Sequence, residues 1–318
     1  MERALRHHRA AWVAVMDASY LEQARLLLRY LPALSSVDCF ALKGGTAINL
    51  FVRDLPRLSV DIDLAFLPLS PRETALTEIR EALAEMAVHA QRLVPGLRVI
   101  NAGGADSPKQ IAATGRARIK IEPNPVLRGT VFPPETRRLT LTAESLFELS
   151  VSAPVVSHAD LYAGKLCAAL DRQHPRDWFD LHLLLDKEGM DEALRQAFVV
   201  YLACHHRPMA ELLKPRTKPL RSTFERAFAG MAREPVSLQA LESTQAELPG
   251  LLLSSLIESE RRFLLSILLG EPEWSLLPFP HLAELPALRW KLVNVENLKR
   301  SPTKHRAAVA ALRAVLEI

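Results

Sequence analysis

The fold is decided by the stretch RLSVDIDL at residues 57–64, which follows a glycine turn, KGGT, at residues 43–46. Polar and apolar residues alternate from 59 to 66, as they do in a half-buried β-strand. Because side chains alternate across a strand, Asp61 and Asp63 share one face of it. At a rise of roughly 3.3 Å per residue their Cα atoms lie about 7 Å apart, so both carboxylates can bind one cation or bridge two.

This acid pair has two interpretations. It fits a solvated strand face that happens to carry two acids, and a D-x-D motif alone does not separate that case from a metal site. Aspartate is depleted in strands, however, and like charges on one face repel each other. A bound cation would remove the repulsion. Mg²⁺ typically takes one or two carboxylates together with phosphate oxygens, so the pair favours a magnesium site.

The glycine turn lies between an apolar run at residues 37–42 and a helical pattern at residues 47–52. Two glycines allow positive φ and let the backbone pass close to a ligand. Free N–H groups at the start of a helix attract phosphate. The turn matches neither the P-loop nor the G-x-G-x-x-G pattern, and a plain tight turn would also explain it. The acid pair on the next strand favours a phosphate-binding turn beside a metal site.

Composition is that of a globular protein with a substantial core, with 318 residues of which 49% are hydrophobic and 24% charged. The length fits one large or two modest domains. A net charge of +4 allows a polyanionic partner without requiring one. The odd cysteine count, three, favours a reducing cytoplasm over a disulfide framework. No apolar run approaches the roughly 20 residues of a membrane helix, and residues 1–9 lack the apolar segment of a signal peptide.

The remaining pattern predicts an α+β fold, with a mixed strand-and-helix half followed by a helical half from residue 157. Helices are expected over residues 2–30 and 70–93, the second capped by Ser70 with Pro71 at its first position. A glycine-containing loop is expected near residues 101–115. The expected strands cover residues 37–42, 59–66, 95–102, 117–122, 126–132 and 149–156.

One lysine, Lys165, interrupts an otherwise apolar helical stretch at residues 161–170. A lysine in apolar surroundings must reach water or find an anion. Reaching water is the commoner outcome, but the acid pair upstream favours a triphosphate partner. Asp177 and Asp180 follow Pro175 in the first turn of another helix, where acids interact well with the helix dipole. We expect Asp180 to have that structural role.

Taken in order, these motifs resemble the DNA polymerase β nucleotidyltransferase superfamily and, more narrowly, the AbiEii/AbiGii family. Members of that family are the toxins of type IV, or abortive-infection, toxin–antitoxin systems. The resemblance extends over about residues 40–185 and includes YAGKL at 162–166 and RDWFDL at 176–181. It implies a polymerase β-like core with a mixed sheet over residues 1–156, including the N-terminal helix. It also implies a helical domain over residues 157–318 that contributes Lys165 and Asp177 to the site.

The resemblance also implies roles for individual residues. Catalytic residues would be Asp61, Asp63, Lys165 and Asp177. The metal would be held by Asp61 and Asp63, with Glu122 as a third acid chosen by strand alternation. For Arg57, a phosphate contact and an ordinary surface position both remain open. The nucleotide-binding residues would be Lys43, Gly44, Gly45, Thr46, Arg57 and Ser59.

The function implied is transfer of a nucleoside monophosphate from a nucleoside triphosphate to RNA, with tRNA and its 3′ end as the acceptor, dependent on Mg²⁺ or Mn²⁺. A cognate antitoxin would be a partner. Basic stretches fit an RNA partner, although solvated helix faces explain any single residue equally well. They comprise Arg207, Lys214, Arg216, Lys218 and Arg221, and then Arg289, Lys291, Lys299, Arg300, Lys304, Arg306 and Arg313. Two alternatives are a non-catalytic module that binds nucleotide or antitoxin, and a kinase that transfers the γ-phosphoryl group.

Overall fold

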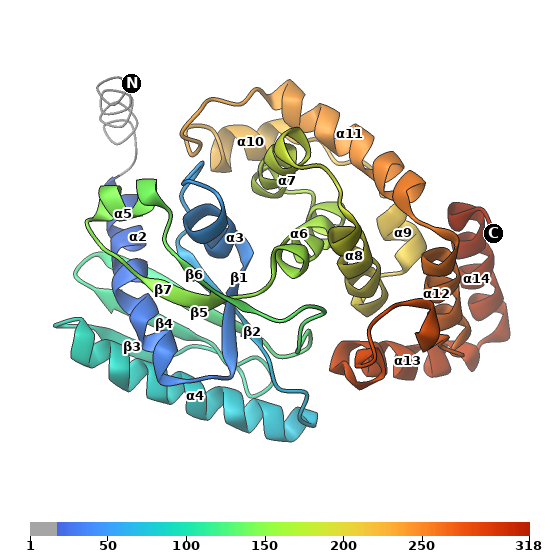
Figure 1. Cartoon of the computed structure of the whole chain (residues 1–318), viewed down its shortest axis with the longest axis horizontal. Helices are drawn as coiled ribbons and strands as arrows, with labels where there is room; N and C mark the ends of the chain where they lie inside the picture. The colour runs from blue at the N-terminus through green and yellow to red at the C-terminus, as the bar shows by residue number, and fades with distance from the viewer. Residues whose placement is uncertain (1–17) are drawn as a thin grey trace. The chain divides into compact units, whose positions relative to one another are not determined.

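The computed structural model describes residues 18–318, which divide into two compact units (Figure 1). The sheet unit comprises the chain up to Pro125, then Pro134–Val156 and Glu225–Val236. The helical unit comprises Val126–Pro133, Ser157–Phe224 and Ser237–Ile318. The chain therefore passes between the units several times, whereas the sequence predicted a single boundary at residue 156. The assignment of functional domains to the two halves stays a prediction.

A mixed seven-stranded sheet forms the sheet unit, in the order β3-β4-β5-β2-β1-β7-β6. β2 lies between β1, to which it is antiparallel, and β5, to which it is parallel. The predicted α+β class with a mixed sheet is confirmed. The strands are β1 (Phe40–Lys43), β2 (Asp61–Phe66), β3 (Arg98–Asn101), β4 (Gln110–Thr114), β5 (Ala117–Asn124), β6 (Glu135–Arg138) and β7 (Ser152–Val155).

The helix α2 (Ala18–Tyr30) covers the apolar face of this sheet and packs against α4 (Arg72–Leu93). Ile121 on β5 is fully buried, and its register partner Gln110 on β4 accepts a hydrogen bond from Tyr30 of α2, Oη to Oε1 3.4 Å. The side chains that alternate with Ile121 therefore point to the opposite face. The other helical segments of the unit are η1 (Leu31–Ser36), α3 (Gly44–Ala47), η2 (Ile48–Val52) and α5 (Leu141–Phe147).

The structure corrects several expected elements. Residues 126–132 form no strand, and the backbone N–H groups of Val131 and Phe132 instead donate to the Asp160 carboxylate at 2.7 and 2.9 Å. Ser70 does not cap the following helix, because its hydroxyl donates to Glu78 at 2.7 Å. Strand β4 occupies part of the expected loop at residues 101–115, and β6 was not anticipated.

The helix expected over residues 2–30 is confirmed from Ala18 to Tyr30, and its earlier part lies outside the described residues. None of the described helices is long and apolar enough to cross a membrane.

The helical unit is built from antiparallel helices that begin with α6 (His158–Arg172) and α7 (Pro175–Lys187). The Ser157 hydroxyl caps α6 by accepting the Asp160 backbone N–H at 3.0 Å, and α6 packs extensively on α8 (Glu192–Cys204). The remaining helices are α9 (Met209–Leu213), α10 (Arg221–Ala227), which crosses into the sheet unit, α11 (Leu238–Ser255), α12 (Glu258–Leu269), η3 (Trp274–Leu276), η4 (Leu282–Glu284), α13 (Pro286–Lys299) and α14 (Pro302–Leu316).

Candidate active site

The two aspartates of β2 lie on the face of the sheet opposite α2. The Cα atom of Asp63 is in register with Lys43 on β1 and with Glu122 on β5. Asp61 and Asp63 are half-buried, while Ile62 between them is fully buried. The alternation predicted for this strand is therefore confirmed, and it places both carboxylates on one face beside a lysine.

Gly44 and Gly45 lie directly against this strand and the segment before it. Gly44 has φ +73°, and a Cβ atom built there would lie 2.1 Å from Oδ2 of Asp63. A Cβ atom on Gly45 would lie 2.9 Å from the Ser59 hydroxyl and 3.0 Å from a guanidinium nitrogen of Arg57. Both turn positions therefore require glycine for close approach, and the structure brings Gly44, Gly45, Arg57, Ser59 and Asp63 together.

Thr46 joins the turn to the acid-bearing strand. Its side chain is fully buried, and its hydroxyl donates to the backbone carbonyl of Asp61 at 2.6 Å. This bond ties α3 to β2 next to the acid pair. In this structure the hydroxyl of Thr46 positions the turn, and the nucleotide-binding role that the resemblance implies for Thr46 stays a prediction.

Arg57 is not a surface residue, so that alternative is wrong. Only 2% of it is exposed, and its Nη1 donates to the Leu58 carbonyl at 3.0 Å. Its backbone forms an antiparallel bridge with Ala232, in the segment of the sheet unit that follows α10. The guanidinium therefore packs under the glycine turn and supports it.

The residues present fit a hard divalent cation held by two carboxylates. The described part of the chain gathers no three His, Cys, Asp or Glu side chains closely enough to hold a metal. Glu122 instead has Nζ of Lys109 3.7 Å from its carboxylate, and both side chains are well exposed. Asp61 and Asp63 supply oxygen ligands on one face, and Mg²⁺ commonly takes one or two such carboxylates plus phosphate and water.

A second group of charges lies inside the helical unit. Lys165 on α6 is only 6% exposed, and its Nζ lies 2.9 Å from Asp177 Oδ1 and 3.0 Å from Asp180 Oδ2, both on α7. The anion that a lysine in apolar surroundings requires is therefore supplied by the protein itself. Asp180 pairs with Lys165, which gives it a second role beyond the helix dipole.

Arg172 completes this group and was missed from the sequence. Its Nε and Nη2 donate to the Asp177 carboxylate at 2.5 and 2.8 Å. Burial alone would raise the pKa of Asp177, but the charges of Lys165 and Arg172 outweigh burial and hold the pKa well below its ordinary value. The sequence signal for Arg172 was its spacing from Lys165, because residues seven apart lie on one face of a helix with 3.6 residues per turn.

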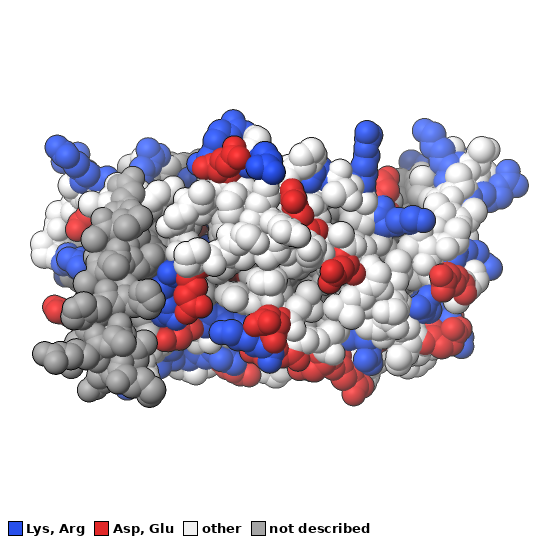
Figure 2. All heavy atoms as spheres, turned by 90° about the horizontal axis from the view of Figure 1, so that it is seen from above, with Lys and Arg blue, Asp and Glu red and all other residues white. Residues whose placement is uncertain are grey.

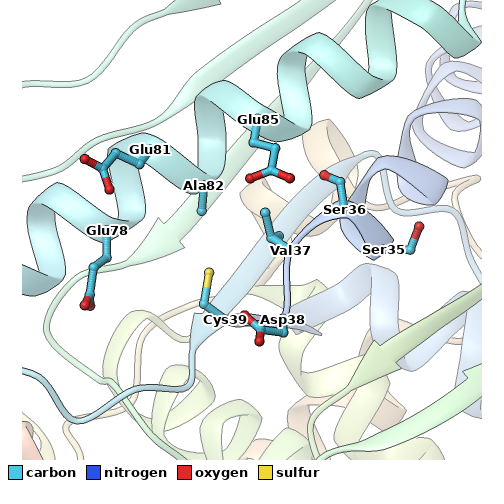
Figure 3. A pocket seen from close by; sticks show the side chains of 9 residues that line it. All are labelled: Ser35, Ser36, Val37, Asp38, Cys39, Glu78, Glu81, Ala82 and Glu85. Carbon is cyan, nitrogen blue, oxygen red and sulfur yellow. The ribbon is translucent and has the colours of Figure 1, made fainter.

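A cavity of about 510 Å³ elsewhere in the sheet unit contains none of the predicted site residues. Figure 3 shows Glu78, Glu81 and Glu85 along α4, facing Asp38 and Cys39 at the start of β1. Its several carboxylates would repel a triphosphate. The acid pair lies near the other end of β1, about 13 Å away at roughly 3.3 Å per residue.

Comparison with known proteins decides the family. The model of the family described as "Nucleotidyl transferase AbiEii toxin, Type IV TA system" matches residues 25–291, well over half of the chain. The chain belongs to the AbiEii nucleotidyltransferase toxin family. This confirms the resemblance drawn from the glycine turn and the acid pair. No curated protein matches the chain.

Among solved structures, this AbiEii-family protein is similar to MenT4, the nucleotidyltransferase toxin Rv2826c from Mycobacterium tuberculosis H37Rv. The TM-score is 0.57 at 19% sequence identity, and the alignment covers 92% of this chain and 98% of that chain. At this identity the likeness establishes a shared fold. The assignment as a nucleotidyltransferase toxin of a type IV system rests on the family match.

Proposed function

We propose that this AbiEii-family toxin transfers a nucleoside monophosphate from a nucleoside triphosphate to RNA, with the 3′ end of a tRNA as acceptor. The observation that carries the proposal is the contact between Gly44 and the Asp63 carboxylate. A glycine turn packed against Asp63 would bring phosphates close to its backbone and to the carboxylates of the acid pair.

Each residue of the sheet unit has a defined task in this proposal. Gly44 and Gly45 would present their backbone to the phosphates, while their missing side chains let Asp63 and Ser59 approach, and Lys43 would add positive charge beside Asp63. Thr46 ties the turn to β2 through its bond to the Asp61 carbonyl, and the Arg57 guanidinium packs against Gly45. When bound, Mg²⁺ or Mn²⁺ on Asp61 and Asp63 would neutralise phosphate charge and lower the barrier to attack at the α-phosphorus.

Lys165 and Asp177 are proposed to serve the same reaction, with Lys165 stabilising negative charge on the nucleotide. Asp177 is a poor general base, since the neighbouring cations keep its pKa low. Its task is to hold the ammonium of Lys165 in one position, 2.9 Å from its own Oδ1. We therefore place Asp177 as a positioning residue.

The test is transfer of label from each of the four α-labelled triphosphates to tRNA, compared between wild type and Asp63→Asn. We expect the variant to lose at least about 100-fold in rate, the order found when a preorganised electrostatic group is removed from an active site. Asp106→Asn is the matched control, because the Asp106 side chain is 80% exposed and pairs with Arg72 at the surface. It should retain wild-type activity.

The other outcomes identify the alternatives. Label that moves from a γ-labelled but not from an α-labelled triphosphate would make the protein a kinase. Nucleotide binding without any transfer would make it a binding module. Undiminished transfer by Asp63→Asn would defeat the assignment of the acid pair. As a toxin it should arrest growth on expression, and a cognate antitoxin encoded alongside should relieve the arrest.

A further inference from the structure

A cationic pocket of about 450 Å³ lies within the helical unit, between the end of α6 and the loop that follows α9. Three of its seven lining residues carry positive charge and none carries negative charge. The lining consists of Gln173, Arg207, Pro215, Arg216, Thr217, Lys218 and Pro219. We call this the 216–218 pocket.

The loop of this pocket is held by two buried glutamines. Gln173 donates from Nε2 to the Arg216 carbonyl at 2.9 Å and accepts the Lys218 backbone N–H on Oε1 at 2.8 Å. Gln245 of α11 donates both to Oε1 of Gln173 at 2.8 Å and to the Lys218 carbonyl at 3.0 Å. Each glutamine is 6% exposed. Flanking prolines at 215 and 219 stiffen the loop further, so the pocket is preorganised.

The loop carries two of the three cations that line the pocket. Arg216 and Lys218 are exposed, and within residues 18–318 neither makes an ion pair. Lys218 Nζ donates a hydrogen bond to the backbone carbonyl of Asp171 at 3.1 Å. Arg207 differs, because it pairs with Asp171 and Glu211 at 2.9 Å each. Arg207 therefore lines the pocket with a charge that is already paired. Arg216 and Lys218 supply the positive charge that a ligand can use.

The pocket adjoins the charged group of α6 and α7 through the chain itself. Gln173 directly follows Arg172, whose guanidinium holds the Asp177 carboxylate. Lys165 lies about 10 Å along the same helix from Arg172, at a rise of 1.5 Å per residue. A ligand in the 216–218 pocket would thus lie at the C-terminal end of α6, the helix that carries Lys165.

We propose that the 216–218 pocket binds a backbone phosphate of the RNA acceptor. The proposal rests on the proposed function and names the contact that would hold its acceptor. Exposed Arg and Lys on a fixed loop are suited to sequence-independent phosphate contacts. Lys214 extends the same run of cations beyond the pocket, which suits a polymer better than one nucleotide. Figure 2 shows one face of the protein, on which the described basic and acidic residues are interspersed.

The test uses the full chain and a fluorescently labelled tRNA transcript, with affinity measured by anisotropy over a range of salt concentrations. Arg216→Ala/Lys218→Ala should weaken binding several-fold and lower the slope of log affinity against log salt by about 1 to 2, the value for one or two lost phosphate contacts. The matched control is Arg92→Ala/Arg98→Ala, which removes two exposed cations of α4 and β3 that lie outside both basic stretches. It should leave both the affinity and the slope close to wild type.

A third variant tests whether the fixed conformation of the loop contributes to binding in addition to its positive charge. Gln245→Ala keeps every cation but removes two hydrogen bonds that hold the loop. We expect weaker RNA binding at an unchanged salt slope, with folding checked by circular dichroism. Equal loss in Arg92→Ala/Arg98→Ala, or no loss in Arg216→Ala/Lys218→Ala, would overturn the proposal.

A measurement of nucleotide binding distinguishes the two possible sources of the bound phosphate, the RNA backbone and the nucleoside triphosphate. Arg216→Ala/Lys218→Ala should bind a fluorescent triphosphate as wild type does and should transfer label to saturating tRNA at the wild-type rate. A loss of triphosphate affinity with unchanged tRNA affinity would assign the pocket to the nucleotide and overturn the proposal. If no variant and no wild type transfers label, the proposed function fails, while the anisotropy measurement still decides whether the pocket binds RNA.

Discussion

Replacing Gly44 with alanine tests the contact on which the proposed active site depends. Two separate effects are expected. The first is conformational, since an L-residue at φ +73° is in the left-handed region and costs about 1–2 kcal/mol relative to glycine. The second is steric, because the new methyl group would lie 2.1 Å from Oδ2 of Asp63, a separation at which one of the two groups must move.

The chain supplies a control for the first effect. Gly189 has the same φ, +73°, and a Cβ atom there would meet nothing within 4 Å. Gly189→Ala should therefore cost the same 1–2 kcal/mol or so in the free energy of unfolding, without disturbing a carboxylate. Any difference between the two variants isolates the contact with Asp63. A displacement of about 1 Å at a reacting group can reduce the rate by about 100-fold.

Two measurements on both variants provide the comparison. Urea denaturation gives the free energies of unfolding, which should fall for each variant, and more for Gly44→Ala. Transfer of α-labelled nucleotide to tRNA should fall by about two orders of magnitude for Gly44→Ala and stay at the wild-type rate for Gly189→Ala. Equal transfer rates in folded samples of the two variants would refute the reasoning that Gly44 fixes the position of the Asp63 carboxylate.

Three further predictions concern the helical unit. Lys165→Met leaves two buried carboxylates without their shared cation, so its free energy of unfolding in urea should fall by about 3–5 kcal/mol; a loss below about 1 kcal/mol would contradict a buried ion group. Burial and the nearby charge of His206 lower the pKa of His205 to about 4, so between pH 6.5 and 4 the unfolded chain binds a proton that the folded chain excludes, and stability falls as pH decreases through that window. His205→Gln should lose less stability than wild type between pH 7 and pH 4.5 in paired urea titrations, and identical losses would refute the assignment. Ser157→Ala removes the cap of α6 and should cost about 1 kcal/mol by the same assay, whereas no measurable change would show that water replaces the hydroxyl.

Alternation of residue types made the central strands β2 and β5 predictable, whereas the edge strand β6, which lacks it, was missed. On β2 and β5, apolar side chains such as Ile62 and Ile121 face the core and alternate with polar ones. Edge strand β6, by contrast, is the polar sequence ETRR, whose side chains are largely exposed. Burial that drives a visible pattern in the centre of a sheet is absent at its rim.

The segment at residues 126–132 shows the opposite error. Its apolar residues suggested a strand, but tertiary hydrogen bonds to Asp160 decide its conformation. Asp160 lies 29 residues from Val131 along the chain. Burial raises the pKa of Asp160, although the N–H groups of this segment, Ser157 and Tyr201 favour its charged form. Local sequence does not reveal a partner so distant.

In the candidate site, the sequence predicted which residues lie together better than it predicted their individual contacts. The acid pair and the glycine turn followed from spacing and from backbone geometry, which are local properties. The burial of Arg57 and the bond from Thr46 to the Asp61 carbonyl depend on how α3 and the segment around Ala232 pack on the sheet. Residue type alone does not reveal these packing contacts, and the contacts of both side chains with a nucleotide stay predictions.

In the charged group of α6 and α7, ion pairs within the protein limit how its members can interact with a phosphate. Lys165 and Arg172 balance Asp177 and Asp180, so the group is neutral as a whole. Three of its members are 6% exposed or less, while the Arg172 side chain is 62% exposed. A phosphate that approaches from solvent would therefore meet Arg172 first, and pairing with it would weaken the hold of that guanidinium on Asp177. Asp177 would then be held by Lys165 alone. Arg172, which lies outside the family motif, therefore affects how firmly Asp177 and Lys165 hold each other.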